Sequence, residues 1–135
     1  MDILNNIEWY FGKPKDAINK DTYKKITKKE LKTVVFEEAK NSITFCFPLN
    51  DDFTVSENRE LKCPITVEQL LNFLSKFYNE PLTQDIVDKA YDDFTDRYED
   101  ISNLTKYNLF DDTCTPDFCG IHPTDEGYFV NIGPE

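Results

Sequence analysis

The stretch CPITVEQLLNFLSKFYNEPLT, residues 63–83, decides the fold because it holds the clearest helix signal in the chain. Thr66 followed by Gln69 forms a capping box, which satisfies free backbone N–H groups at a helix start. Apolar residues then recur at spacings of three and four, which places them on one helix face. This stripe consists of Val67, Leu70, Leu71, Leu74, Phe77 and Tyr78. Pro81 ends the pattern, so the sequence predicts an amphipathic helix that must bury this face.

A second amphipathic helix is expected after Thr83. Aspartate and glutamate residues occupy much of the surface opposite its apolar stripe, as in a helix that packs on one side only. The stripe consists of Ile86, Val87, Ala90, Tyr91, Phe94, Tyr98 and Ile101. The short link at Pro81 joins the two helices into one αα unit. The apolar stripes of both helices must then be buried against a sheet.

Strand signals lie on both sides of the helices. Residues 33–48 contain β-branched and aromatic runs on both sides of Ala39, Lys40, Asn41 and Ser42, which predicts a hairpin. Residues 50–62 are polar and are expected to form a loop. A turn at 123–127 leads into a strand at 128–132. The order predicts an α+β fold, an antiparallel sheet of about four strands with both amphipathic helices on one face.

Length and composition favour a single domain over residues 1–135. The chain is 39% hydrophobic and 14% aromatic, which is enough apolar material for a core. Residues 1–32 are expected to form an N-terminal helix or arm followed by a Lys-rich connector. Residues 33–135 are expected to form the α+β core.

Charge is unevenly distributed along the chain. The sequence has 26 acidic and 15 basic residues, a net charge of −11, yet residues 1–40 carry nine Lys against seven acids. A nucleic-acid scaffold needs an overall positive surface to displace counterions, so the sequence predicts no nucleic-acid partner. One basic cluster stands out, and it is interpreted as a solvated face, with a phosphate-binding patch as the alternative. It consists of Lys20, Lys24, Lys25, Lys28, Lys29 and Lys32.

Neither a membrane span nor a signal peptide is recognisable. No run approaches the roughly 18 apolar residues that a spanning helix needs, and the N-terminus lacks a charged region before an apolar one. The sequence therefore predicts a soluble protein without a membrane partner, located in the cytoplasm. In that reducing compartment the four cysteines are expected to be thiols.

The stretch FDDTCTPDFCGIHP, residues 110–123, contains two cysteines and the only histidine. Cys114, Cys119 and His122, with Cys63 as a fourth ligand, would make a tetrahedral zinc site. The two-residue spacing between cysteines that is usual in such sites is missing, and cysteine is often simply a small buried residue. We expect ordinary thiols, no metal and no cofactor, and we keep a zinc-stabilised domain as the alternative.

Catalytic motifs are missing from the sequence. It has no glycine-rich phosphate loop and no nucleophile elbow, and its single histidine leaves few acid–base schemes. We therefore predict that the protein is not an enzyme. A small carboxylate-dependent enzyme is the weaker alternative, and it would need a pocket that raises the pKa of one carboxyl group.

The acidic second helix is the predicted partner-binding surface. Its carboxylates could meet a basic protein partner, although an acidic face also serves solubility. The residues expected to bind are Asp92, Asp93, Asp96, Glu99 and Asp100. The predicted function is thus a non-enzymatic protein-interaction module.

Two stretches, PITVEQLLNFLSKFYNEPLT and LFDDTCTPDFCGIHPTDEGYFVNIGPE, with an acidic helix between them, resemble a family of small uncharacterised domains from giant-virus and fungal genomes. The similarity covers residues 64–133 and implies a domain of α+β type, without an activity or site residues. Eleven Asn against three Ala, two Arg and four Gly indicate an AT-rich genome, which favours the viral source. The protein would then act in the host cytoplasm or the virion.

Overall fold

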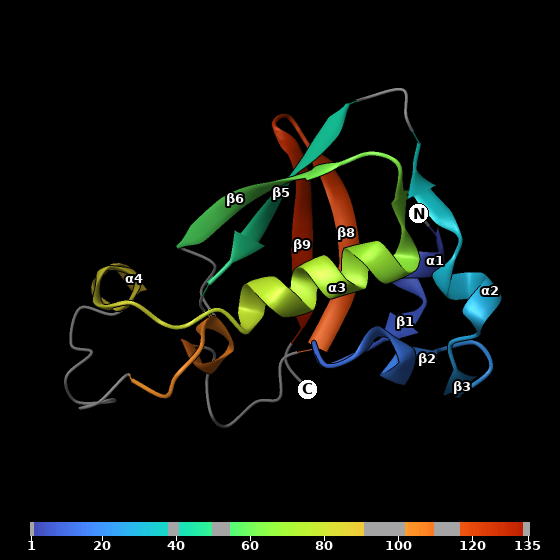
Figure 1. Ribbon diagram of the computed structural model, residues 1–135, viewed down its shortest axis with the longest axis horizontal. Helices are drawn as coiled ribbons and strands as arrows, with labels where there is room; N and C mark the ends of the chain where they lie inside the picture. The colour runs from blue at the N-terminus through green and yellow to red at the C-terminus, as the bar shows by residue number, and fades with distance from the viewer. Residues whose placement is uncertain (1, 38–40, 50–54, 91–101, 110–116, 134–135) are drawn as a thin grey trace.

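The computed structural model describes residues 2–37, 41–49, 55–90, 102–109 and 117–133. Helices and strands both contribute, so the α+β class is confirmed (Figure 1). The elements are α1 (Asp2–Asn5), β1 (Ile7–Glu8), the 3₁₀ helix η1 (Pro14–Asp16), β2 (Ile18–Asn19), β3 (Lys24–Lys25), α2 (Lys28–Leu31), β4 (Val34–Phe36), β5 (Ser42–Pro48), β6 (Ser56–Lys62), β7 (Ile65–Thr66), α3 (Val67–Tyr78), α4 (Gln84–Ala90), the 3₁₀ helix η3 (Lys106–Leu109), β8 (Asp117–Thr124) and β9 (Gly127–Gly133).

Helix α3 matches the sequence prediction. The Thr66 hydroxyl accepts a hydrogen bond from the Gln69 N–H at 3.2 Å, and the Gln69 side chain accepts one from the Thr66 N–H at 2.9 Å. All six residues of the expected apolar stripe are buried. The Phe77 ring stacks on Phe47 of β5 with centroids 4.0 Å apart, so α3 packs against the main sheet.

The main sheet has four strands in the order β6-β5-β9-β8. Its two outer pairs are antiparallel, but the central pair β5–β9 is parallel, with Phe45 opposite Tyr128 and Cys46 opposite Phe129. The expectation of an all-antiparallel sheet was therefore wrong. A parallel pair needs a long connection rather than a tight turn, and the chain between β5 and β9, which includes α3, supplies it. Two further small sheets, β1-β2-β3 and β4-β7, lie outside it.

The predicted hairpin at residues 33–48 and loop at 50–62 are both corrected. Strand β4 pairs with β7, where Phe36 lies opposite Ile65, and β5 pairs with β6 over seven residues. Strand β6 is an edge strand with the polar sequence SENRELK, whose side chains alternate between exposed and half-buried. Charged residues are common on edge strands because they discourage pairing with other chains, and they conceal the hydrophobic alternation of a strand.

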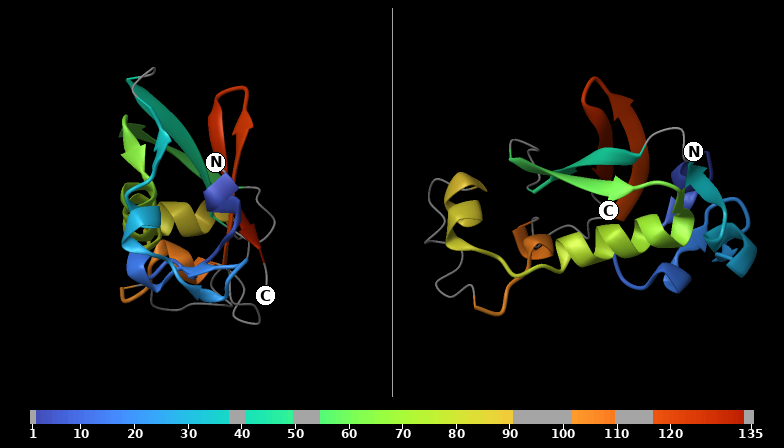
Figure 2. Two further views of the ribbon diagram at one scale, coloured as in Figure 1. Left: turned by 90° about the vertical axis from the view of Figure 1, so that its right-hand side faces the viewer. Right: turned by 45° about the horizontal axis from the view of Figure 1, so that its top comes forward.

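The two predicted helices do not lie side by side. Helix α4 lies beyond the C-terminal end of α3 in Figures 1 and 2, rather than next to it over the sheet. Val87 of α4 is buried, while the rest of the predicted second helix, residues 91–101, lies outside the described residues. The described part of the chain therefore places one long helix, α3, on the sheet.

The N-terminal residues belong to the same hydrophobic core as the sheet and α3. Trp9 is buried, its ring lies edge-on to Phe118 of β8, and its carbonyl accepts the Phe118 N–H at 2.8 Å. Phe11 is 3% exposed and contacts the rings of Trp9, Tyr78, Tyr107 and Phe118. The N-terminal segment thus closes the end of the core beside β8 and supports β2 and β3 outside it.

Candidate functional site

The turn between β2 and β3 is a rigidly built element at one end of the molecule. The Asn19 side-chain oxygen accepts the N–H groups of Asp21 at 2.8 Å and Thr22 at 3.4 Å. The Asn19 backbone carbonyl accepts the Tyr23 N–H at 2.8 Å. Asparagine is favoured at such positions because its short side chain bonds the backbone two residues ahead. Asn19 thus holds the turn through three hydrogen bonds, and a bond from the Lys20 N–H to the Asn6 carbonyl at 2.7 Å anchors it further.

Tyr23, the last residue of this turn before β3, combines strain with exposure. Its φ is 58°, a left-handed conformation that costs a residue with a side chain roughly 1–2 kcal/mol. Phe11, with φ 64°, is the other described non-glycine residue of this kind, and its burial in the aromatic core offsets the cost. Tyr23 is 84% exposed, so its ring gains no comparable packing energy. Folding alone does not explain a tyrosine at this position.

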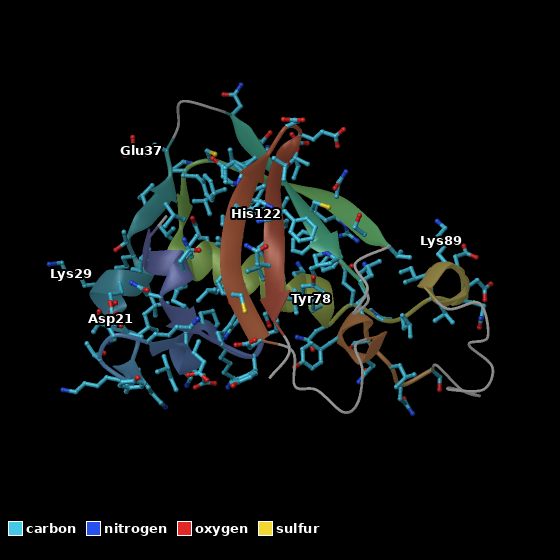
Figure 3. All side chains as sticks on the ribbon, turned by 180° about the vertical axis from the view of Figure 1, so that it is seen from behind. Asp21, Lys29, Glu37, Tyr78, Lys89 and His122 are labelled. Carbon is cyan, nitrogen blue, oxygen red and sulfur yellow. The ribbon has the colours of Figure 1, made fainter. Side chains whose placement is uncertain are left out.

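Tyr23 lies within the most lysine-rich stretch of the sequence, and the lysines of this stretch are largely without carboxylate partners in the described structure. Eight lysines lie between residues 13 and 32, and within the described ranges only Lys25 has a carboxylate within 4.0 Å, that of Asp16. The other seven are Lys13, Lys15, Lys20, Lys24, Lys28, Lys29 and Lys32. We call Tyr23 and these eight lysines the Lys–Tyr face. Figure 3 shows Lys29 at the end of the molecule opposite Lys89.

The other two acidic side chains in this region are held by neutral partners. Glu30 accepts the Thr27 N–H and the Asn19 amide, both at 3.0 Å, and Asp21 accepts the Asn6 amide at 3.2 Å. The hydrogen bond from the Thr27 backbone lowers the pKa of Glu30, against an opposing effect of burial and with further help from Asn19 and the Thr27 side chain. These two carboxylates maintain the local structure and leave the positive charge of the Lys–Tyr face in excess.

The candidate zinc ligands are not brought together in the described structure. Cys119 and His122 lie on β8, and Cys63 follows β6, while Cys114 lies outside the described residues. The His122 Nδ1 atom lies 2.9 Å from the Asn131 Oδ1 atom on β9 (Figure 3). Burial raises the pKa of the Cys119 thiol, and the nearby Asp117 raises it further. Over the described ranges no three His, Cys, Asp or Glu side chains are grouped to hold a metal ion.

A charge cluster around the buried Lys106 side chain, which the sequence did not indicate, lies where β6, the end of α3 and η3 meet. The Lys106 ammonium contacts the carboxylates of Glu80 at 2.6 Å and Glu57 at 3.1 Å, and lies 4.2 Å from the Phe77 ring centroid. Arg59 bonds the same two carboxylates. Burial raises the pKa of Glu80, but hydrogen bonds from Lys106 and Arg59 outweigh it and hold that pKa below its ordinary value. A carboxylate kept charged in this way suits a structural role better than acid catalysis.

A shallow hollow of about 300 Å³ lies beside the β8–β9 turn, against β5. Gly127 is required there, because a Cβ atom would lie 2.3 Å from the Thr44 carbonyl oxygen. The acidic side chains at its rim, Asp125 and Glu126, are both exposed. The hollow lacks the converging buried polar groups of a ligand site.

The five acidic residues predicted to bind a partner, from Asp92 to Asp100, lie outside the described residues. Comparisons with protein-family profiles, curated proteins and solved structures found no match to this chain. The resemblance to small giant-virus and fungal domains therefore stays an expectation from the sequence. Among the described helices, none is long and apolar enough to cross a membrane.

Proposed function

We propose that this chain is a non-enzymatic protein-interaction module and that the β2–β3 turn is its docking element. One observation carries the proposal: Tyr23 is held in a strained conformation by a fixed turn, while 84% of its surface is exposed. Backbone strain that packing does not offset is concentrated at functional sites. Tyrosine is also among the residues that contribute most to protein interfaces.

The rigid turn favours binding because little order is lost on association. The three hydrogen bonds to Asn19 fix the backbone before a partner arrives. A side chain that is already presented by a fixed backbone avoids part of the entropic cost of docking. The Tyr23 ring has few torsions of its own, which reduces that cost further.

A capture experiment with the full chain tests the proposal. Tagged protein is incubated with an extract of the cells that produce it, beside Tyr23→Asn, which removes the ring but tolerates a left-handed backbone. Tyr23→Phe keeps the ring, and Tyr10→Asn is the matched control because Tyr10 is 42% exposed. We expect Tyr23→Asn to reduce capture of a specific protein about tenfold, with the other two variants near wild type. Equal capture by Tyr23→Asn contradicts the proposal.

The acidic surface predicted from the sequence is a second proposed contact. Reversing Asp92, Asp96 and Glu99 to Lys in the same capture experiment separates the two surfaces. Loss of a basic partner in that variant alone would assign the acidic stretch its own role.

Source and compartment are proposals of the same kind. The AT-rich composition favours a virus, and the proposed site of action is the host cytoplasm or the virion.

A further inference from the structure

We infer that the Lys–Tyr face binds an acidic protein segment, with the Tyr23 ring as its apolar anchor and the lysines as its charge complement. This inference rests on the proposed function, because it names the partner chemistry of the same turn. The net charge of the chain is −11, which by itself favours a basic partner, whereas this surface favours an acidic one.

The first step of the argument is the charge that remains after local pairing. Residues 13–32 contain eight lysines and three acids, and Asp21 and Glu30 bond neutral groups rather than lysines. The third acid, Asp16, lies 4.0 Å from Lys25 in an exposed pair, which contributes little. A partner with several carboxylates would meet seven ammonium groups that have no carboxylate within 4.0 Å in the described structure.

The second step is the choice of protein over nucleic acid. Residues 41–135 carry 19 acidic and six basic residues, so a polyphosphate longer than the Lys–Tyr face would meet a repulsive surface. Residues 13–32 contain no arginine, the residue that binds phosphates and bases in a bidentate manner. Single-stranded nucleic acids also need successive aromatic rings for stacking, whereas this turn presents one. A short acidic peptide can stay within the basic face.

The third step is the part played by Tyr23. Contacts among exposed charges act mainly on the association rate and contribute little affinity. A ring that enters an apolar site on the partner supplies the affinity that these charges lack. Tyr23 adjoins Lys24 and Lys25 in sequence. An acidic segment that also carries an apolar residue can therefore contact the Tyr23 ring and pair its carboxylates with these lysines.

The test is a titration of the isotope-labelled full chain with a poly-glutamate peptide that carries leucines at intervals, followed by backbone NMR shifts at about 0.15 M salt. We expect shifts confined to residues 13–32. The double variant Lys24→Glu with Lys29→Glu should raise the Kd for the peptide about tenfold, because it replaces two attractive charges with repulsive ones. A tenfold change in Kd corresponds to about 1.4 kcal/mol. The control variant Lys76→Glu with Lys89→Glu changes the net charge by the same amount and should raise the Kd for the peptide less than about threefold.

Each other outcome overturns the inference in a distinguishable way. Tighter binding of oligothymidylate than of the peptide would assign the face to nucleic acid, and binding of phosphatidylserine vesicles alone would assign it to lipid. Equal weakening by both lysine pairs would show a net-charge effect without a site. If the peptide causes no shifts but capture from the extract still depends on Tyr23, the inference fails and the proposed function stands. If capture is independent of Tyr23, both fail.

Discussion

Lys106 and Glu80 form an ion pair of 2.6 Å although the Lys106 side chain is only 4% exposed. The pair connects η3 to the end of α3, and Glu57 extends it to β6. The Lys106 N–H also donates to the Glu80 carbonyl at 3.1 Å, so side-chain and backbone contacts together hold η3 against the C-terminal end of α3.

Replacing Lys106 with Met should lower the free energy of unfolding by about 1–3 kcal/mol, as when a buried charged hydrogen bond loses one partner. Methionine keeps the packing over Phe77, so the loss reports the charge. Lys89→Met, at an exposed position, should change stability by no more than about 0.5 kcal/mol in the same denaturant titration. Equal effects of the two variants would show that the cluster is not stabilising.

The stability lost in Lys106→Met should depend on pH. The pKa of Glu80 is lowered in the folded state, from an ordinary value of 4.5. A group with a lowered folded pKa stabilises the fold above its ordinary pKa, and this stabilisation is lost as the pH falls through the folded pKa. The difference between wild type and Lys106→Met should thus be full near neutral pH and shrink below pH 4.5. Denaturant titrations across this range measure it, and a constant difference would contradict the assignment.

Glycine should have opposite effects at the two strained aromatic positions. At Tyr23, glycine relieves the left-handed strain and loses little packing, so stability should rise by up to about 1 kcal/mol. At Phe11, which is 3% exposed, glycine removes a buried ring and should cost at least about 3 kcal/mol. Thermal and denaturant unfolding compare the two. A large loss with Tyr23→Gly would mean that its ring supports the fold.

The purified protein should carry no stoichiometric zinc, because Cys119 and His122 have other neighbours, Asp117 and Asn131. Elemental analysis checks this. One zinc ion per chain that is lost in Cys119→Ser would restore the alternative of a zinc-stabilised domain.

Leu74→Ala should cost about 2–5 kcal/mol, as expected for a fully buried leucine. Glu68→Ala, on the exposed side of the first turn of α3, should cost about 0.5 kcal/mol. Similar losses in urea titrations would show that the buried face of α3 has been misassigned.

Local signals were the part of the fold that the sequence could predict. The capping box and the stripe of α3 depend on residues within one or two turns of each other. The pairing of β4 with β7 and the parallel pairing of β5 with β9 depend on distant residues, which local patterns cannot reveal. Strand β6 was hidden by its polar edge sequence.

The candidate site was predictable only in part. The lysines were recognisable from composition, but the left-handed backbone and the exposure of Tyr23 have no signal in the local sequence. Lys106 lies in a stretch with no pattern of its own, and its burial depends on Glu57 and Glu80 from two other elements.

The parallel pairing of Phe45 with Tyr128 also determines when the sheet can be completed during synthesis. The ribosome releases the β5–β6 hairpin and α3 long before β9 exists. Until then one edge of β5 has no strand to pair with, and open strand edges promote association with other chains. A nascent chain that stalls before residue 128 would therefore be a target for chaperones, while the finished chain has this edge covered.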